Sequence, residues 1–309
     1  MRAPDIAEMT LRVSGRARIA ETPLGPVEHA EAGDGPALLS LHPAMGGWDT
    51  GLGMAAAFWS NGWRVIAPSR PGYLGTPEGA GGDPASQADR MAALLDALAI
   101  DSCAVVGHCA GGIVGYELAA RHPDRVRSLV LISTPTAPDI GVSPGVLRIA
   151  MTRPMLAMLM RRDRALLGSS VEDAARRMIG DDSTLGETVV ERLARRVAAD
   201  PSRAAYVTSV WGRRTVRSAE RFPGARLDAF EAWDVLEDPS LASVGCPTLV
   251  IHGGAEPLGV AHAERAAARI PDAELRVIPQ GSHHALWVSD DAAAQQAFAL
   301  DWVRSHPSG

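Results

Sequence analysis

The feature that most constrains the fold of this chain is the turn Gly107-His108-Cys109-Ala110-Gly111. Residues 103–106 before it have the apolar pattern of a buried strand, and residues 111–121 after it suit a helix. A strand-to-helix reversal this tight strains the backbone of its central residue, and flanking glycines are needed because side chains there would clash. The turn therefore predicts that the Cys109 side chain is exposed at the edge of a sheet, beside the first N–H groups of a helix.

Short apolar runs alternate with alanine-rich stretches in the first and last parts of the chain. This alternation is typical of a mostly parallel sheet covered by helices. Strands are expected at residues 11–19, 27–32, 37–41, 64–67, 103–106, 128–133, 248–252 and 275–278. Helices are expected at residues 53–61, 84–99, 111–121 and 261–269. Asp83 and Pro84 suit the N-cap and first turn of the second of these helices.

The alternation stops after Ser133. From about residue 134 to residue 238 the sequence is typical of helix and loop, with helices expected at 146–160, 171–179, 188–198 and 204–216. The simplest arrangement is a helical cap at residues 134–239, inserted into an α/β core formed by residues 1–133 and 240–309.

Composition limits the function classes. The chain has 309 residues, of which 46% are hydrophobic and 21% charged, which suits a soluble globular protein with a large core. A net charge of -6 argues against nucleic acid as a partner. No apolar run of about 18 residues is present to span a membrane. Residues 1–10 lack the basic and apolar regions of a secretory signal.

The three cysteines are Cys103, Cys109 and Cys246, an odd number without a CxxC pair. This argues against a disulfide framework or a structural zinc site and fits a cytoplasmic location. No histidine pair spaced i, i+4 has a partner acid, so we expect no metal. The chain contains no lysine, which excludes a lysine-bearing phosphate-binding glycine loop. No cofactor is expected.

The turn around Cys109 resembles the nucleophile elbow of the α/β-hydrolase fold family, G-x-S-x-G, with cysteine in place of serine. The resemblance covers roughly residues 20–133 and 240–305, and it implies a mostly parallel eight-stranded sheet flanked by helices. A lone cysteine is more often a small buried hydrophobe, which is the role expected of Cys103 and Cys246. Between two glycines at a strand-to-helix turn, Cys109 is instead expected to be a nucleophile.

The resemblance also implies a catalytic base in the loop after the last core strand. Residues 279–287 form that loop here and contain His283 and His284. Counting from the strand favours His283, although Ser282 replaces the glycine that usually precedes the histidine. His284 remains the alternative. If His283 is the base, His284 is expected to pack near the cap or to face solvent.

An acid is implied after the penultimate strand, where Glu256 stands in place of the usual aspartate. A carboxylate there would fix the imidazole tautomer and stabilise the imidazolium. A surface role before Pro257 is the alternative for Glu256, and Asp139 is a less favoured candidate for the acid. Nucleophile, acid and base follow each other in the family's chain order.

Residues 39–47 resemble the family's HG-x-x-G loop, with Pro43 in place of the first glycine. By position, the backbone N–H groups of Ala44 and Ala110 would form the oxyanion hole. Proline lacks an N–H, but the donor needed belongs to the next residue. Neighbouring side chains expected to line the substrate pocket are His42, Trp48, His108 and Trp287.

Together these residues imply a hydrolase that cleaves an ester, lactone or thioester of a largely apolar small molecule through a Cys109 acyl-enzyme. The methionine-rich apolar residues 146–160 are of a kind that more often serves packing than a pocket. Caps of this family nevertheless roof the nucleophile, so some of these side chains are expected to touch substrate. A thioester intermediate reacts readily with amines and carbanions. An acyltransferase or chain-releasing cyclase, acting on a small or carrier-bound acyl substrate, therefore stays open.

Two further alternatives follow from the cysteine. The chain could be a serine hydrolase whose nucleophile was replaced by cysteine to trap an acyl intermediate. It could also be a non-catalytic ligand-binding protein on the same scaffold. A complete set of nucleophile, acid and base argues against the second alternative, because a receptor needs none of the three.

Overall fold

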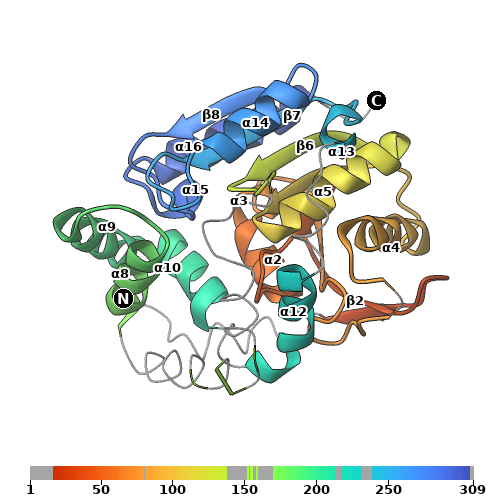
Figure 1. The fold of residues 1–309 in the computed structure, drawn as a ribbon, viewed down its shortest axis with the longest axis horizontal. Helices are drawn as coiled ribbons and strands as arrows, with labels where there is room; N and C mark the ends of the chain where they lie inside the picture. The colour runs from red at the N-terminus through yellow and green to blue at the C-terminus, as the bar shows by residue number, and fades with distance from the viewer. Residues whose placement is uncertain are drawn as a thin grey trace.

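The computed structural model of the protein describes residues 17–79, 81–137, 152, 154–155, 158, 170–212, 217–230 and 239–306. Helices pack on both faces of a central sheet (Figure 1). Of the first predicted strand, only the residues from 17 onward are described. Of the methionine-rich residues 146–160, only 152, 154, 155 and 158 are described, so the helix predicted there lies largely outside the described residues.

The central sheet has eight strands in the order β1-β2-β4-β3-β5-β6-β7-β8. They are β1 (Arg18–Ala20), β2 (Val27–Ala32), β3 (Ala37–Leu41), β4 (Arg64–Pro68), β5 (Cys103–His108), β6 (Val126–Ile132), β7 (Thr248–Gly253) and β8 (Glu274–Ile278). The pairs β1-β2 and β2-β4 are antiparallel, and all other pairs are parallel. The predicted eight-stranded, mostly parallel sheet is therefore confirmed, with ends shifted by one or two residues in most strands.

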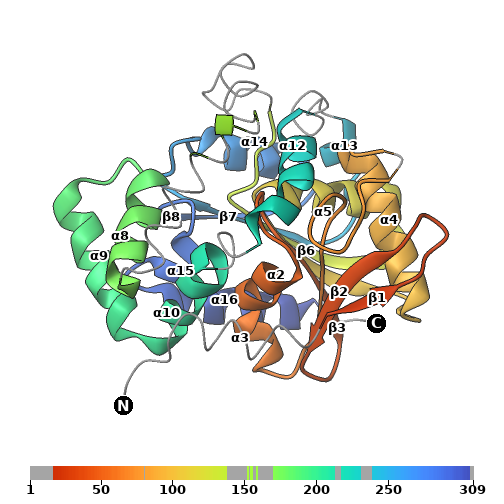
Figure 2. The ribbon, with the colours of Figure 1, turned by 90° about the horizontal axis from the view of Figure 1, so that it is seen from below.

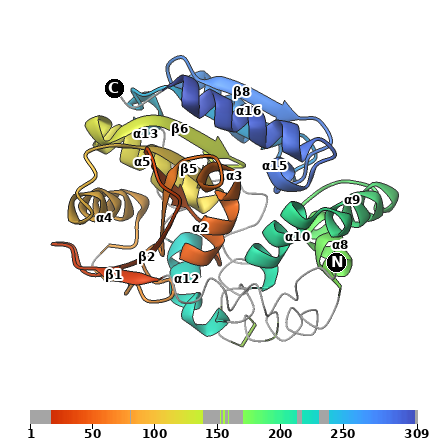
Figure 3. The same cartoon turned by 180° about the vertical axis from the view of Figure 1, so that it is seen from behind.

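Two hydrophobic cores cover the two faces of the sheet. One contains side chains of α4 (Pro84–Ala97), α5 (Ala110–Arg121), α13 (Pro239–Ala242) and α14 (Ala261–Arg269). The other contains side chains of α2 (Trp48–Met54), α3 (Ala56–Trp59), α15 (Ala285–Val288) and α16 (Ala292–Ser305), and the view from behind shows α16 lying over β8 (Figure 3). A short 3-10 helix, η1 (Pro123–Arg125), precedes β6.

Local sequence signals explain most helix starts. The Asp83 side chain accepts a hydrogen bond from the Ser86 N–H at 2.9 Å, and Pro84 occupies the first turn of α4, as expected. The predicted helix at 53–61 is wrong in its bounds, because helix begins at Trp48 and is interrupted at Ala55.

The described residues between β6 and β7 form helices. Besides α13, they are α8 (Val171–Asp181), α9 (Glu187–Ala199), α10 (Pro201–Val207), the π-helical turn η3 (Thr208–Gly212), the 3-10 helix η4 (Ser218–Glu220) and α12 (Phe222–Phe230). Figure 2 shows α8, α9 and α10 grouped at one side of the sheet, where α10 contacts α2 and α15. The predicted helix at 204–216 instead starts at Pro201, since the Asp200 side chain caps α10. A separate cap with bounds 134–239 stays a prediction.

None of the helices in the described ranges is both long and apolar enough to cross a membrane.

Candidate active site

Cys109 stands between β5 and α5 with a strained backbone, at φ 52° and ψ −123°. A Cβ on Gly107 would lie 2.6 Å from the Gly112 Cα, and one on Gly111 would lie 2.3 Å from the Leu41 carbonyl oxygen. Both glycines are required because these neighbours are backbone atoms that cannot move aside. A positive φ at a non-glycine residue costs about 1–3 kcal/mol and persists only where the surroundings hold it. The half-buried Cys109 side chain thus lies at the carboxyl end of β5.

His283 lies between Cys109 and Glu256. Its Nδ1 is 2.6 Å from Oε1 of Glu256, which leaves Nε2 for Cys109, the other side chain that interacts with this ring. The Glu256 side chain has no exposed surface, and that of His283 is 15% exposed. Burial alone would lower the pKa of His283, but the Glu256 carboxylate and Cys109 raise it well above its usual value. The three predicted catalytic side chains are therefore together and electrostatically coupled.

Glu256 is a buried carboxylate whose charge is compensated by its neighbours. Burial alone would raise the pKa of Glu256, but His283, His252 and Ser133 together outweigh this effect, and the net shift is downward. The His252 Nε2 lies 3.2 Å from Glu256 Oε2 without the alignment of a hydrogen bond. Burial lowers the pKa of His252, so His283 is the main partner of the carboxylate. Ser133, which has a positive φ of 47°, contributes a further hydrogen bond to Glu256.

His284 faces the helices between β6 and β7 instead of Cys109. The Tyr206 hydroxyl donates to its Nδ1 at 2.8 Å, and its Nε2 donates to Asp182 Oδ2 at 3.1 Å. Both ring nitrogens are therefore occupied, in a neutral tautomer assigned from these partners. Burial lowers the pKa of His284, which keeps the ring neutral. The structure thus brings His283, and not His284, to Glu256 and Cys109.

His108 and Trp287 lie beside the His283 ring. The His108 Nε2 donates to the His283 carbonyl oxygen at 3.1 Å, and its ring centroid is 4.6 Å from that of His283. Burial lowers the pKa of His108 well below its usual value. Trp287 is 5.0 Å from His108, stacks on Tyr206 at 4.5 Å and donates to the Met54 carbonyl oxygen. These rings are buried around the base, and their role as pocket walls stays a prediction.

The loop after β3 holds the predicted oxyanion donor. Ala44 is exposed, Met45 has a positive φ of 61°, and no hydrogen bond is made by the Ala44 N–H within the described part of the chain. Ala110 is the first residue of α5, so its N–H has no intrahelical acceptor. His42 is fully buried, and its Nδ1 donates to the Pro43 carbonyl oxygen at 2.7 Å.

The other nitrogen of His42, Nε2, accepts from the Arg70 backbone N–H at 3.0 Å. Both nitrogens of His42 are thus used to hold the loop, and neither is left for a ligand. Burial lowers the pKa of His42 and of His108 well below the usual value, and it also lowers the pKa of His284. We call these three residues the buried neutral histidines.

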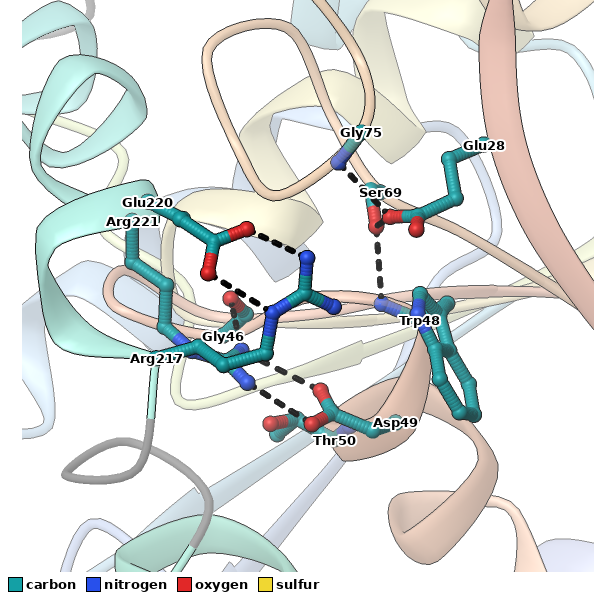
Figure 4. A network of polar contacts seen from close by, with 10 residues as sticks. All are labelled: Glu28, Gly46, Trp48, Asp49, Thr50, Ser69, Gly75, Arg217, Glu220 and Arg221. Atoms are coloured by element: carbon teal, nitrogen blue, oxygen red, sulfur yellow. Dashed lines mark hydrogen bonds and ion pairs between the residues drawn. The ribbon is translucent and has the colours of Figure 1, made fainter. Parts of the chain in front are cut away.

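Trp48 is buried at the start of α2, and its backbone N–H donates to Ser69 Oγ at 3.2 Å (Figure 4). Ser69 in turn donates to the Glu28 carboxylate at 2.9 Å. In the same view Arg221 faces Asp49, with contacts of 2.7 and 3.1 Å, and donates to the Gly46 carbonyl oxygen. The loop is therefore held by residues from both the core and the segment before α12.

Within the described residues, no three His, Cys, Asp or Glu side chains are grouped so that they could hold a metal ion.

Comparison with known proteins identifies the fold family. A family model described as alpha/beta hydrolase fold matches residues 36–290. The chain belongs to this family.

The proteins that this chain resembles in sequence and structure include hydrolases. It is 26% identical over 274 residues to 2-hydroxy-6-oxo-6-phenylhexa-2,4-dienoate hydrolase of Burkholderia cepacia, covering 85% of this chain and 86% of that protein. It resembles the structure of an alpha/beta hydrolase fold protein from Nakamurella multipartita, with a TM-score of 0.82 and 29% identity over 94% of this chain and 100% of that one. An enol-lactonase from Burkholderia xenovorans shares the fold at 19% identity, with a TM-score of 0.62 over 93% and 100% of the two chains. The similarities support hydrolase activity.

Sequence reasoning missed the contacts that the helices between β6 and β7 make with the catalytic loops of this α/β-hydrolase-fold chain. The Asp182 carbonyl oxygen accepts from the His283 N–H at 3.0 Å, and the Thr184 N–H donates to the Ala255 carbonyl oxygen at 2.7 Å. Residue pairs so far apart in the chain leave no local sequence pattern, so no motif could have indicated them.

Proposed function

We propose that the protein is a hydrolase that cleaves an ester, lactone or thioester of a largely apolar small molecule through an acyl-enzyme on Cys109. The observation that carries the proposal is the series of interacting side chains from Cys109 through His283 to the fully buried Glu256 carboxylate. A non-catalytic binding protein has no use for a buried carboxylate paired with a histidine beside a strained cysteine.

The arrangement accounts for each step of acyl transfer to water. His283 accepts the Cys109 proton while the sulfur attacks the acyl carbon, and Glu256 stabilises the resulting imidazolium. The backbone N–H groups of Ala44 and Ala110 hold the oxyanion. Collapse of the tetrahedral intermediate expels the leaving group, which takes the proton from His283. His283 then deprotonates a water molecule that attacks the thioester, and the Cys109 thiol is restored as the acid leaves.

Two observations support a largely apolar substrate. Buried aromatic rings, namely His108, Trp287 and Tyr206, surround the base. In addition, the Burkholderia cepacia relative is named for a substrate that carries a phenyl group. We further propose that the helices between β6 and β7 form the cap of the site, because Asp182 and Tyr206 contact the loop that carries His283.

Labelling with p-nitrophenyl butyrate tests the nucleophile. Burial raises the pKa of Cys103 to about 12 and that of Cys246 to about 11, so both stay protonated thiols near neutral pH. Intact-protein mass spectrometry should therefore show one butyryl group on the wild type and on Cys246→Ala, and none on Cys109→Ala. A label on Cys103 or Cys246 would contradict the assignment.

The same ester distinguishes hydrolysis from acyl transfer. Product release is followed with and without added amines or alcohols. A product ratio that does not depend on acceptor concentration supports hydrolysis, whereas capture of most acyl groups by the acceptor would make the protein an acyltransferase.

A further inference from the structure

Asp228 of α12 is a buried carboxylate at the centre of a polar network. Its side chain is 4% exposed, and that of its partner Arg70 is not exposed at all. The Arg70 guanidinium donates to both carboxylate oxygens of Asp228 at 2.6 Å, and the Tyr73 hydroxyl donates to Oδ2 at 2.5 Å. A further N–H of Arg70 donates to Gln87 Oε1 at 3.0 Å. The buried charges are thus paired and hydrogen-bonded, as a low-dielectric setting requires.

Both partners of Asp228 hold the backbone of the loop that carries Ala44. The Arg70 Nε donates to the His42 carbonyl oxygen at 3.1 Å, and its backbone N–H donates to the His42 ring, which in turn bonds to Pro43. The Tyr73 hydroxyl accepts from the Met45 N–H at 3.3 Å. The residues on either side of Ala44 are therefore tied to one carboxylate.

Ala44 needs such support. The next residue, Met45, has a positive φ of 61°, a backbone conformation that persists only where surrounding contacts impose it. A catalytic hydrogen-bond donor must also keep its direction during the reaction, because an error of about 1 Å in position can cost about a hundredfold in rate. A satisfied buried network is rigid and suits this task.

We propose that Asp228, acting through Arg70 and Tyr73, positions the Ala44 N–H for the oxyanion. This role rests on the proposed function. The three residues, which we call the Asp228 anchor, are buried and act on Ala44 through the loop backbone, so they are positioning residues. The proposal makes the rate of acylation depend on α12, although α12 supplies no reacting group.

Tyr73→Phe is the sharpest test, because it removes only the hydroxyl that joins Asp228 to the Met45 N–H and leaves the ion pair intact. Tyr116→Phe is the matched control, since Tyr116 is a buried tyrosine of α5 outside the anchor. The acylation rate at saturating p-nitrophenyl butyrate and the concentration giving half that rate are measured by stopped flow. Amide hydrogen exchange of residues 43–47 is followed in parallel.

We expect Tyr73→Phe to slow acylation about tenfold or more, with an unchanged half-saturation concentration and faster amide exchange in residues 43–47. Tyr116→Phe should change neither quantity. Asp228→Asn should act in the same direction as Tyr73→Phe and more strongly, and the exchange measurement shows whether its loop is released while the rest of the fold is retained.

A wild-type acylation rate in Tyr73→Phe would overturn the proposal, and so would a slower rate with unchanged exchange in residues 43–47. Failure of the proposed function gives a different result, namely a wild-type protein whose Cys109 is not acylated at all. In that case the exchange data alone decide whether the anchor holds the loop.

Discussion

Replacing Glu256 by glutamine should remove the partner of the His283 imidazolium while keeping the size of the side chain. The two groups are 2.6 Å apart at their closest atoms, and the Glu256 side chain has no exposed surface. At a charge separation of about 4 Å and an effective dielectric constant of about 20, their attraction is about 4 kcal/mol. That corresponds to about a thousandfold in the rate of a step that needs the imidazolium.

The measurement is single-turnover acylation of Glu256→Gln by p-nitrophenyl butyrate across a range of pH. We expect a rate about a thousandfold below wild type and a His283 pKa that falls, because only burial and Cys109 still act on the ring. The pH at which His283 loses its proton therefore moves downward. Glu274→Gln is the control, since Glu274 lies on β8 and its side chain hydrogen-bonds only to Trp302 within the described residues.

A Glu256→Gln rate within about tenfold of wild type would refute this reasoning. The acid would then have to be another carboxylate. Asp139, which lies outside the described residues, would be the next candidate, and Asp139→Asn would show the loss expected here for Glu256→Gln.

Four further predictions follow from the same structure. Gly111→Ala should lower the free energy of unfolding, measured by urea titration, by about 2–3 kcal/mol, because the new Cβ would lie 2.3 Å from the Leu41 carbonyl oxygen. Gly245→Ala is the control, since a Cβ there meets open space, and equal stabilities of the two variants would contradict the prediction. His283→Ala should abolish acylation and His284→Ala should keep most of it, and the reverse result would exchange their roles. Cys109→Ser should acylate at least about tenfold more slowly, since a hydroxyl is harder to deprotonate, and faster turnover would indicate a serine enzyme with a replaced nucleophile. Because burial lowers the pKa of the buried neutral histidines, the unfolded chain binds more protons than the folded protein. Their contribution to the free energy of unfolding should be complete above about pH 6.5 and fall below it by up to about 1.4 kcal/mol per pH unit for each histidine. The pKa of His283 is raised, so its contribution is lost only above that pH. A flat urea profile on acidification would contradict this.

Local sequence patterns were enough to predict the sheet and the turn at Cys109. Strands such as β3 and β5 are short apolar runs between turn residues and are buried on both faces. This pattern is typical of the central strands of a parallel sheet. The strained backbone of Cys109 depends on Gly107 and Gly111, which lie within two residues of it. A short continuous segment of the sequence therefore contains its cause. The bounds of α2 and α10 were missed. The start of α10 has a local signal in the capping side chain of Asp200, whereas α2 begins at Trp48 without a side-chain cap and packs against β2 and β4.

The choice between His283 and His284 was made only by tertiary structure. The two residues are adjacent and follow the same strand, so counting could favour one without excluding the other. Asp182 and Tyr206 hold the His284 ring from α8 and α10, at sequence separations of 102 and 78 residues. Only with that ring turned away does His283 face Glu256.

By itself, then, the sequence determined the mostly parallel sheet and the position of the strained cysteine, because both depend on backbone sterics and periodicity within short segments. The fold family came from the resemblance of the turn at Cys109 to a known motif. The surroundings that aim the catalytic groups were decided by the tertiary structure. Asp228 and Arg70 are 158 residues apart, and the sequence around either residue does not indicate that the two form an ion pair. Such a pair forms only after the chain between the two residues has folded. Folding buries both charges in a region of low dielectric constant, where each charge needs an oppositely charged partner.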